Sequence, residues 1–371
     1  MPAFRFGHAT AADVDECIGQ CLAQLGPPDS GPGRLGFVYF TDYFAPHAAA
    51  IVARLREGTA VDHWVGSVGI GVVASGHEYL DRPAIVAMIG DFEPGSFRVF
   101  PTIATREAVV SGVLDTPVGP ANFAVVHGDP ENGLVPELIV DLARHAESGF
   151  LVGGLGSSRR ANVQVAGGVT AGGLSGAAFS GDVAIATRLT QGCSPMGAKH
   201  VITECQRNIV VALDGKPALD VLKADVGEKL ARDLPRLGGY LFVGLPIPGS
   251  DTDDYLVRHL VGIDPDSKLI AIGDVPVQGR SLMFCRRDRE SAAADMRRML
   301  DSIQQGLFAP PRGALYYSCL GRGPNLFGDE SAELGMIRNA LGDVPLVGFF
   351  CNGEISHNRL YGYTGVLTLF A

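Results

Sequence analysis

Residues 313–371 carry the pattern that decides the fold. They begin with the apolar run Ala314-Leu-Tyr-Tyr-Ser-Cys-Leu320 and the turn Gly321-Arg-Gly323, before a helix-length segment at 330–341. A second apolar run, Pro345-Leu-Val-Gly-Phe-Phe350, leads to the polar turn Cys351-Asn-Gly-Glu354 and a last alternating strand at 363–370. Short apolar runs between glycine turns are typical of buried strands. The predicted order is therefore strand, glycine loop, helix, strand, polar turn and strand.

Looser copies of this order occur upstream, at residues 35–89, 122–187 and 239–284. In the copy at 239–284, an Asp-capped helix is predicted at 252–261, followed by a hairpin of 269–272 with 281–284. Repeated strand-loop-helix-strand-strand units predict an α/β fold of the α+β type. We expect two similar domains, 1–225 and 226–371, each with a mostly antiparallel sheet covered by helices. The first domain includes an N-terminal helix within residues 1–34.

Composition excludes several classes of protein. With 371 residues, 46% hydrophobic and 19% charged, the chain has the composition of a folded globular protein rather than a disordered one. A net charge of −10 without a long basic run disfavours nucleic acid as a partner. No apolar run is long enough to span a membrane, and residues 1–10 lack the apolar core of a signal peptide. We expect a cytoplasmic protein whose seven separate cysteines are reduced.

Cofactor and metal motifs are missing or incomplete. The glycines around Gly154 and Gly156 lack the third glycine and the following helix of a dinucleotide loop. Gly321-Arg-Gly323 lacks the Lys and Ser or Thr of a phosphate-binding loop, and Asp251-Thr-Asp-Asp254 lacks the Glu that ends a calcium loop. No zinc-ligand spacing occurs. The sequence therefore predicts neither a cofactor nor a metal.

Polar residues instead gather at strand-end turns. If the units pack about a pseudo-twofold axis, these turns would converge on one cleft. An Arg beside glycine N–H groups binds a carboxylate, and Glu354 or Asp42 can hold an ammonium group, so the cleft would suit an amino acid. The alternative is that these are ordinary turn residues. The residues concerned are Ser67, Glu78, Asn162, Arg322, Asn352 and Glu354.

A thiol nucleophile is the enzymatic alternative. Cys319 and Cys351 follow equivalent strands of residues 313–371, with Glu354 and His357 nearby in sequence. A Cys–His pair at a strand end could form an acyl-thioester. Free cysteine is commonly a small buried apolar residue, and packing is the favoured interpretation here. We therefore expect Cys319 and Cys351 among the ligand-binding residues rather than as nucleophiles.

Three strings resemble the FIST family: Gln191-Gly-Cys-Ser-Pro-Met-Gly197, Ser318-Cys-Leu-Gly-Arg-Gly323 and, most specifically, Val347-Gly-Phe-Phe-Cys-Asn-Gly-Glu-Ile355. The resemblance runs from about Leu35 to the C-terminus. It implies a FIST N-terminal domain over 1–225 and a FIST C-terminal domain over 226–371. It also implies an intracellular sensory module that binds small ligands such as amino acids.

The resemblance supplies no catalytic residue, so a non-enzymatic sensor is predicted. FIST modules are often joined to signalling output domains, or to an F-box in eukaryotes, and we expect no output domain within this chain. The expected partners are a small ligand and a signalling protein. A thiol enzyme and a ligand-free protein-interaction scaffold are the alternatives. This chain departs from the family at Ser67-Val-Gly69, where the acidic residue is displaced to Glu78.

Overall fold

The computed structural model describes residues 4–29, 31, 33–231, 239–247, 255–328 and 331–371, which form two compact units. Unit 1 combines Met1–Thr190 with Met296–Ala371, and unit 2 comprises Gln191–Asp295. Unit 2 is thus inserted into the sequence of unit 1. The sequence boundary expected near Asp225 lies within unit 2, so the spatial units and the two sequence halves are different divisions of the chain.

Unit 1 is built from three repeats, each with a strand, a helix and a second strand parallel to the first. Repeat 1 contains β2 (Arg34–Thr41), α2 (Ala48–Thr59) and β3 (His63–Gly69). Repeat 2 contains β8 (Phe123–Gly128), α3 (Val135–Ala143) and β9 (Phe150–Leu155). Repeat 3 contains β21 (Gly313–Cys319), α7 (Ala332–Leu341) and β22 (Leu346–Cys351).

Each repeat adds a third strand, antiparallel to its first, and an edge strand beyond it. The third strands are β6 (Ile85–Asp91), β12 (Leu174–Phe179) and β25 (Thr364–Phe370). The edge strands are β1 (Arg5–Ala9), β7 (Phe97–Ile103) and β13 (Ile185–Gln191). The predicted mixed α/β fold with repeated units and mostly antiparallel sheets is confirmed.

The repeats exchange hairpins in a cycle. The hairpin β4 (Gly71–Ala74) and β5 (His77–Leu80) of repeat 1 joins β22 of repeat 3. The hairpin β23 (Glu354–His357) and β24 (Arg359–Tyr361) of repeat 3 joins β9 of repeat 2. The hairpin β10 (Gln164–Ala166) and β11 (Val169–Thr170) of repeat 2 joins β3 of repeat 1. The result is three six-stranded sheets in pseudo-threefold relation, instead of the expected pseudo-twofold packing.

One glycine recurs at the same place in all three repeats. Gly66, Gly153 and Gly348 lie in the middle of β3, β9 and β22. A Cβ atom on any of them would collide with a carbonyl oxygen of the preceding parallel strand, which belongs to Val38, Val126 and Tyr316 in turn. These glycines therefore permit a close approach of two backbones, and they fix the alignment of the repeats used below.

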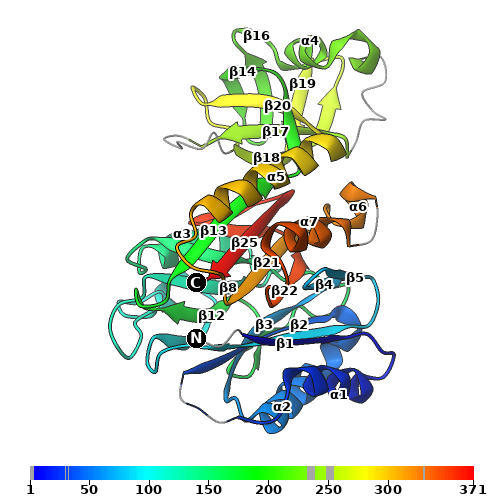
Figure 1. The fold of residues 1–371 in the computed structure, drawn as a ribbon. Coiled ribbons are helices and arrows are strands. Elements are labelled where there is room, and N and C mark those ends of the chain that lie inside the picture. The colour runs from blue at the N-terminus through cyan, green and yellow to red at the C-terminus, as the bar shows by residue number, and fades with distance from the viewer. Residues whose placement is uncertain (1–3, 30, 32, 232–238, 248–254, 329–330) are drawn as a thin grey trace. The chain divides into compact units, whose positions relative to one another are not determined.

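Helices cover the outer faces of the sheets. Figure 1 shows α1 (Val14–Leu25) and α2 together on one side of the sheet that contains β1 and β2. Asp13 begins α1, because its side chain accepts a hydrogen bond from the amide of Glu16 at 2.9 Å. Buried Ile18 and Leu55 join the apolar cluster against the sheet. The other helical segments of unit 1 are η1 (Asp42–His47), η2 (Arg106–Ala108), α6 (Pro324–Phe327) and most of α5 (Arg289–Gln305).

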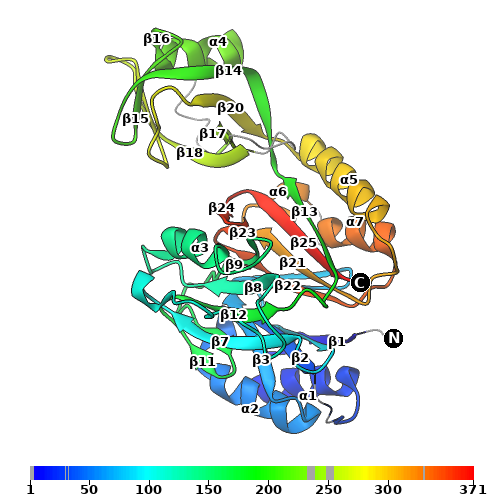
Figure 2. The same cartoon turned by 90° about the vertical axis from the view of Figure 1, so that its left-hand side faces the viewer.

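The described residues of unit 2 form a closed barrel of six antiparallel strands. In order around the barrel these are β14 (Cys193–Gln206), β20 (Ser281–Arg287), β17 (Leu241–Pro246), β18 (Tyr255–Asp264), β19 (Leu269–Ile272) and β15 (Ile209–Leu213). Figure 2 shows β14, β15, β17, β18 and β20 of this barrel. Pairing of β15 with β14 closes the barrel, which removes exposed sheet edges. The short β16 (Lys216–Pro217) extends the sheet, and α4 (Ala218–Ala231) contributes Leu219 and Leu222 to the core.

Two secondary-structure predictions in unit 2 are wrong. The helix expected at 252–261 is strand β18 from Tyr255 onward, and residues 252–254 lie outside the described chain. Tyr255 and Val257 are buried while Leu256 is half-buried, an alternation that suits a strand between β17 and β19. The hairpin expected from β19 and β20 does not form, since β19 pairs with β18 and β15, and β20 pairs with β14 and β17.

Candidate functional site

The ends of β3, β9 and β22 meet in a ring of hydrogen bonds that links the three repeats. The amide of Ser157, just after β9, donates to Val68 O of repeat 1 at 3.3 Å. The amide of Asn352, just after β22, donates to Leu155 O of repeat 2 at 3.1 Å. Ser157 and Asn352 occupy equivalent positions, so the same backbone contact occurs twice.

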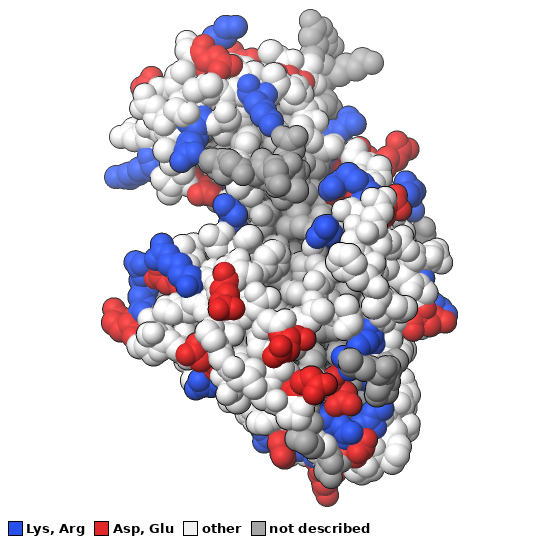
Figure 3. Space-filling model, turned by 60° about the vertical axis from the view of Figure 1, so that its left-hand side comes forward, with Lys and Arg blue, Asp and Glu red and all other residues white. Residues whose placement is uncertain are grey.

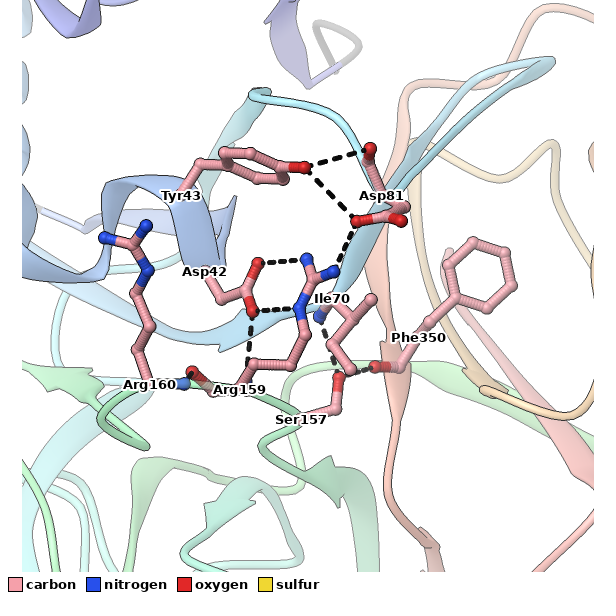
Figure 4. A network of polar contacts seen from close by, with 9 residues as sticks. Asp42, Tyr43, Ile70, Asp81, Ser157, Arg159, Arg160 and Phe350 are labelled. Atoms are coloured by element: carbon pink, nitrogen blue, oxygen red, sulfur yellow. Dashed lines mark hydrogen bonds and ion pairs between the residues drawn. The ribbon is translucent and has the colours of Figure 1, made fainter.

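Ser157 completes this ring with its side chain. Its Oγ accepts a hydrogen bond from the amide of Ile70 in repeat 1 at 2.9 Å and donates to Phe350 O of repeat 3 at 2.5 Å. Figure 4 shows Ser157 between these two backbone groups. The polar turns of all three repeats are therefore held at one end of the parallel strands.

Four of the predicted site residues lie together at this end. Cys319 and Cys351 are direct register partners on the parallel strands β21 and β22. Glu354 lies on β23 opposite Gly154, and a side chain at Gly154 would collide with Cys351 Sγ. Arg322 follows β21 in the loop before α6. We call Cys319, Arg322, Cys351 and Glu354, together with Glu333 of α7, the strand-end cluster.

Glu333 holds Arg322 in place. Arg322 is 0% exposed; its Nε donates to Glu333 Oε1 at 2.7 Å, and its Nη2 lies 2.7 Å from the same oxygen. Glu333 also accepts hydrogen bonds from Tyr316 Oη at 2.5 Å, Ser318 Oγ at 3.0 Å and the amide of Gly323 at 3.0 Å. This buried ion pair fixes the guanidinium, but Arg322 Nη1 makes no hydrogen bond with the described residues.

Glu354 is a further buried ionisable group of the strand-end cluster. It is 0% exposed, and its Oε2 accepts hydrogen bonds from the amide of Thr364 at 3.1 Å and from Thr364 Oγ1 at 2.7 Å. Its Oε1 makes no hydrogen bond within the described chain. Burial raises the pKa of Glu354 to about 8, although Thr364, Arg322 and Cys319 act in the opposite direction. The carboxyl group can thus exchange a proton near neutral pH.

Tyr363 lies beside the strand-end cluster, against Gly321. It adopts a left-handed backbone conformation with φ 62°, which is uncommon for a bulky residue. A Cβ atom added at Gly321 would lie 3.1 Å from the Tyr363 ring, so the ring packs directly over the glycine that precedes Arg322. The following residue, Thr364, is the hydrogen-bond partner of Glu354.

The hairpin exchange brings Glu78 to α7. Its Oε1 accepts a hydrogen bond from the amide of Leu334 at 3.2 Å in the first turn of that helix. Its Oε2 lies close to Gly323 and makes no hydrogen bond with the described residues. Burial, and then the charge of Glu333, raise the pKa of Glu78 to about 7. Glu78 thus acts as a helix cap supplied by another repeat.

Ser67 and Asn162 form a neighbouring group around Gly156. A Cβ atom at Gly156 would lie 3.3 Å from Ser67 Oγ and 3.5 Å from Asn162 Oδ1. The amide nitrogen of Asn162 donates to Glu131 Oε1 at 3.2 Å. Gly154 and Gly156 are two residues apart at the end of β9, so this group and the strand-end cluster flank one segment. The side chain of Asn352, in contrast, is exposed.

The two thiols are unsuited to nucleophilic attack. Burial raises the pKa of Cys319 well above its usual range, and the nearby Glu354 adds to this effect. Burial also raises the pKa of Cys351, with further contributions from Glu354 and Cys319. A thiolate is the reactive form, so both groups stay protonated at neutral pH.

The positions equivalent to Glu354 in the other repeats provide a comparison within the molecule. Gly154, Ser67 and Phe349 are equivalent residues of β9, β3 and β22. Their partners on the exchanged hairpins are Glu354, Gln164 and Val72, in that order. The amide nitrogen of Gln164 donates to Gly173 O at 2.9 Å, and its oxygen accepts from Ser175 Oγ at 2.5 Å. The polar residue of repeat 2 is therefore neutral and fully paired, and only repeat 3 carries a charged group here.

Sequence reasoning missed a polar triad at the centre of unit 1. Tyr39, His127 and Tyr317 occupy equivalent positions on β2, β8 and β21, and all three are 0% exposed. The hydroxyl of Tyr39 lies 3.1 Å from His127 Nε2 and 2.9 Å from the hydroxyl of Tyr317. Burial lowers the pKa of His127 to about 3. Alignment of the repeats on Gly66, Gly153 and Gly348 would have identified the triad.

An ion-pair clamp beside the ring was also missed. Asp42 Oδ2 accepts from the amide and Nε of Arg159 at 3.0 and 2.9 Å, and Oδ1 accepts from Nη2 at 2.9 Å (Figure 4). Arg159 Nη1 also contacts Asp81 Oδ1 at 2.6 Å. Burial acts to raise the pKa of Asp42, but the contacts with Arg159 outweigh it and lower that pKa. Both carboxylate oxygens of Asp42 therefore bind Arg159, in the loop after β9.

The described residues were also compared with the requirements of a metal site, a membrane span and a charged surface patch. They include no group of three or more His, Cys, Asp or Glu side chains arranged to hold a metal ion. None of the described helices combines the length and apolar character needed to cross a membrane. Figure 3 shows Lys and Arg side chains interspersed with Asp and Glu on the face drawn.

Comparisons with known proteins cover nearly the whole chain. Residues 34–216 match the FIST N domain, and residues 218–357 match the FIST C domain. An uncharacterized protein of Mycobacterium tuberculosis (strain ATCC 25618 / H37Rv), Rv0628c, is 28% identical over 98% of each chain. An uncharacterized protein of Mycobacterium bovis, Mb0898c, is 28% identical over 96% of this chain and 94% of its own length.

Proposed function

The chain belongs to the FIST family, whose domains are generally sensory, signal-transduction domains, and we propose that it is a cytoplasmic sensor of an amino acid or similar zwitterionic metabolite. The ligand would bind at the strand-end cluster, and a signalling protein would respond to its binding. FIST sensory domains are generally not enzymes, and the raised pKa values of Cys319 and Cys351 are consistent with a binding role.

One observation carries the proposal. Two buried ionisable side chains, Arg322 and Glu354, each keep a polar atom without a hydrogen-bond partner among the described residues. Buried charged groups that lack partners are costly, so such atoms call for an explanation. A ligand carboxylate would accept a hydrogen bond from Arg322 Nη1, and a ligand ammonium group would donate to Glu354 Oε1.

Equivalent positions argue against a purely structural role. If a carboxylate were needed to hold the end of β23, the matching places on β10 and β4 would need a similar group. They carry Gln164, which is fully paired, and Val72, which is apolar. The charge is thus a property of repeat 3 alone. Its neighbour Arg322 is likewise replaced at the equivalent positions, by Phe44 and Asn132.

Access would depend on the turn at Tyr363. The ring of Tyr363 packs on Gly321, the residue before Arg322, and Arg322 and Glu354 are both fully buried. Binding would require the turn to open and then to close over the ligand. Closure would exclude water, which strengthens the electrostatic contacts of a charged ligand.

A thermal-shift screen tests the proposal. Purified protein would be melted with each common amino acid and with related amines and carboxylates. A ligand at a hundredfold excess over its Kd adds about 2.7 kcal/mol of stability, which corresponds to a rise of several degrees in Tm. Glu354→Gln keeps the shape of the side chain and an acceptor for Thr364, and it should abolish the shift.

A matched control comes from repeat 2. Gln164→Leu removes two buried hydrogen bonds at the position equivalent to Glu354, and it should lower Tm without affecting the ligand-dependent shift. The proposal would be wrong if no compound raises Tm of the wild type. It would also be wrong if Glu354→Gln responds to the ligand as the wild type does.

A further inference from the structure

The start of β25, which hydrogen-bonds to Glu354, also contacts the residue that leads into unit 2. Thr364 donates two hydrogen bonds to Glu354, and Gly365 follows it directly. A Cβ atom at Gly365 would lie 3.1 Å from Thr190 Cγ2 and would collide with the hydroxyl of Tyr316. Thr190 is the last residue of the first segment of unit 1, and Gln191 is the first residue of unit 2. The first two residues of β25 therefore link the cluster to this connection.

The two segments that connect the units are tied to each other. The chain leaves unit 1 at the end of β13, a neighbour of β25, and returns through α5. Within unit 1, Arg188 Nε of β13 donates to Ser302 Oγ of α5 at 3.2 Å. Within unit 2, the amide of Gln191 donates to Asp295 Oδ2 at 2.6 Å. A shift of β13 would therefore act on both connections.

We propose that the state of Glu354 is transmitted to unit 2 through Tyr363 and the start of β25 (Thr364 and Gly365), Thr190 and the β13–α5 connection. The ligand side of this inference rests on the proposed function, because a ligand on Glu354 changes what Thr364 contacts. A ligand shifts a conformational equilibrium only through contacts that differ between the two states. The hydrogen bonds of Thr364 to Glu354 are such contacts.

Repeat 2 again supplies the comparison. Gln164 is equivalent to Glu354 and accepts a hydrogen bond from Ser175 Oγ on β12. The edge strand beside β12 is β7, which stays within unit 1. Loss of a buried hydroxyl at Ser175 should therefore leave the connection to unit 2 unaltered. Loss of the hydroxyl at Thr364 should instead make the connection to unit 2 less stable.

Hydrogen exchange of the full chain tests this inference without a ligand. Thr364→Val removes the hydroxyl but keeps the shape of the side chain, and Thr364→Ala is a second variant in case the first does not fold. Loss of a hydrogen bond to a carboxyl group should speed exchange of the amides at 187–193 about tenfold or more. Thr364→Ser, which keeps the hydroxyl, should restore the wild-type rate, and Ser175→Ala should not change it.

The outcomes separate this inference from the proposed function. Unchanged exchange at 187–193 in both Thr364 variants would overturn the coupling, even if an amino acid raises Tm of the wild type. An equal change in Ser175→Ala would also overturn it, because the effect would then be general loosening. Faster exchange in the Thr364 variants alone would support the coupling, even if no amino acid in the screen binds.

Discussion

Tyr39 and Tyr317 are 278 positions apart in sequence, yet their hydroxyl oxygens lie 2.9 Å apart in the core of unit 1. They occupy the same position in repeats 1 and 3, and His127 occupies it in repeat 2. The three side chains meet because the repeats are related by a pseudo-threefold axis and exchange hairpins in a cycle. The centre of unit 1 is thus a small polar network inside an apolar core.

This network predicts coupling between distant residues. Tyr317→Phe should lower the free energy of unfolding by about 1 kcal/mol, the usual net value of a buried hydrogen bond. In a double-mutant cycle, Tyr39→Phe and Tyr317→Phe should be non-additive, because each removes the same contact. Urea unfolding of the wild type, both single variants and the double variant measures the coupling. Additive effects would show that the two hydroxyls do not interact.

The buried His127 predicts a loss of stability in acid. Burial holds its folded pKa near 3, below the value of about 6.5 for an unfolded chain. Below pH 6.5 the unfolded state binds one more proton here, so stability falls with falling pH down to the folded pKa. The slope from one proton is about 1.4 kcal/mol per pH unit. His127→Phe should reduce the slope of unfolding free energy against pH by that amount, and an unchanged slope would contradict the assignment.

Glu354 predicts the opposite dependence on pH. Its folded pKa of about 8 lies above the model value of 4.5 for an unfolded chain. Between these values the folded state binds more protons, so stability falls as pH rises from 4.5 toward 8. Glu354→Gln should therefore gain stability relative to the wild type as pH rises across this range. Denaturant titrations at several pH values test this, and a constant difference between the two proteins would count against it.

The ion pair of Arg322 and Glu333 predicts a large structural effect. Both side chains are 0% exposed, so removal of one partner leaves a buried charge unpaired. Arg322→Met should destabilise unit 1 by about 3–5 kcal/mol. Arg54→Met is the matched control, because Arg54 and its partner Asp15 are 46% and 71% exposed, and it should cost less than about 1 kcal/mol. Similar losses in both variants would show that burial of the first pair is unimportant.

Thiol labelling separates a binding role from a thiol enzyme. Cys319 and Cys351 should react slowly with iodoacetamide in the native protein, because burial keeps both thiols protonated. Cys205 and Cys319 are both half-buried, and Cys205 should be alkylated first because the pKa of Cys319 is raised well above its usual range. Mass spectrometry of timed samples at several pH values gives the order. Rapid labelling of Cys319 or Cys351 at neutral pH would revive the enzymatic alternative.

Local signals predicted the repeats but not their assembly. The apolar runs and glycine turns of residues 313–371 are short-range features, and β21, α7 and β22 form where expected. The exchange of hairpins depends on pairing between distant segments, which no local pattern encodes. The cluster Asp251-Thr-Asp-Asp254 suggested a helix start, yet pairing with β17 and β19 makes the following residues a strand. Long-range pairing overrode the local preference.

The candidate site was partly predictable for the same reason. Cys319, Arg322, Cys351 and Glu354 come from turns of one repeat, so their spacing placed them together. Glu333 was not anticipated, because a charged residue in the first turn of a helix is usually a solvated one, and its burial follows from Tyr316, Ser318 and Arg322 converging on it. Glu78 looked displaced in sequence, and only the exchanged hairpin brings it to α7.

The most direct test is a crystal structure of the protein with the amino acid that gives the largest rise in Tm. The proposed site predicts ligand density beneath Tyr363, with the carboxylate within hydrogen-bond distance of Arg322 Nη1 and the ammonium group within reach of Glu354 Oε1. Density for the ligand elsewhere, with Arg322 and Glu354 unchanged, would contradict the assignment of the strand-end cluster as the sensory site.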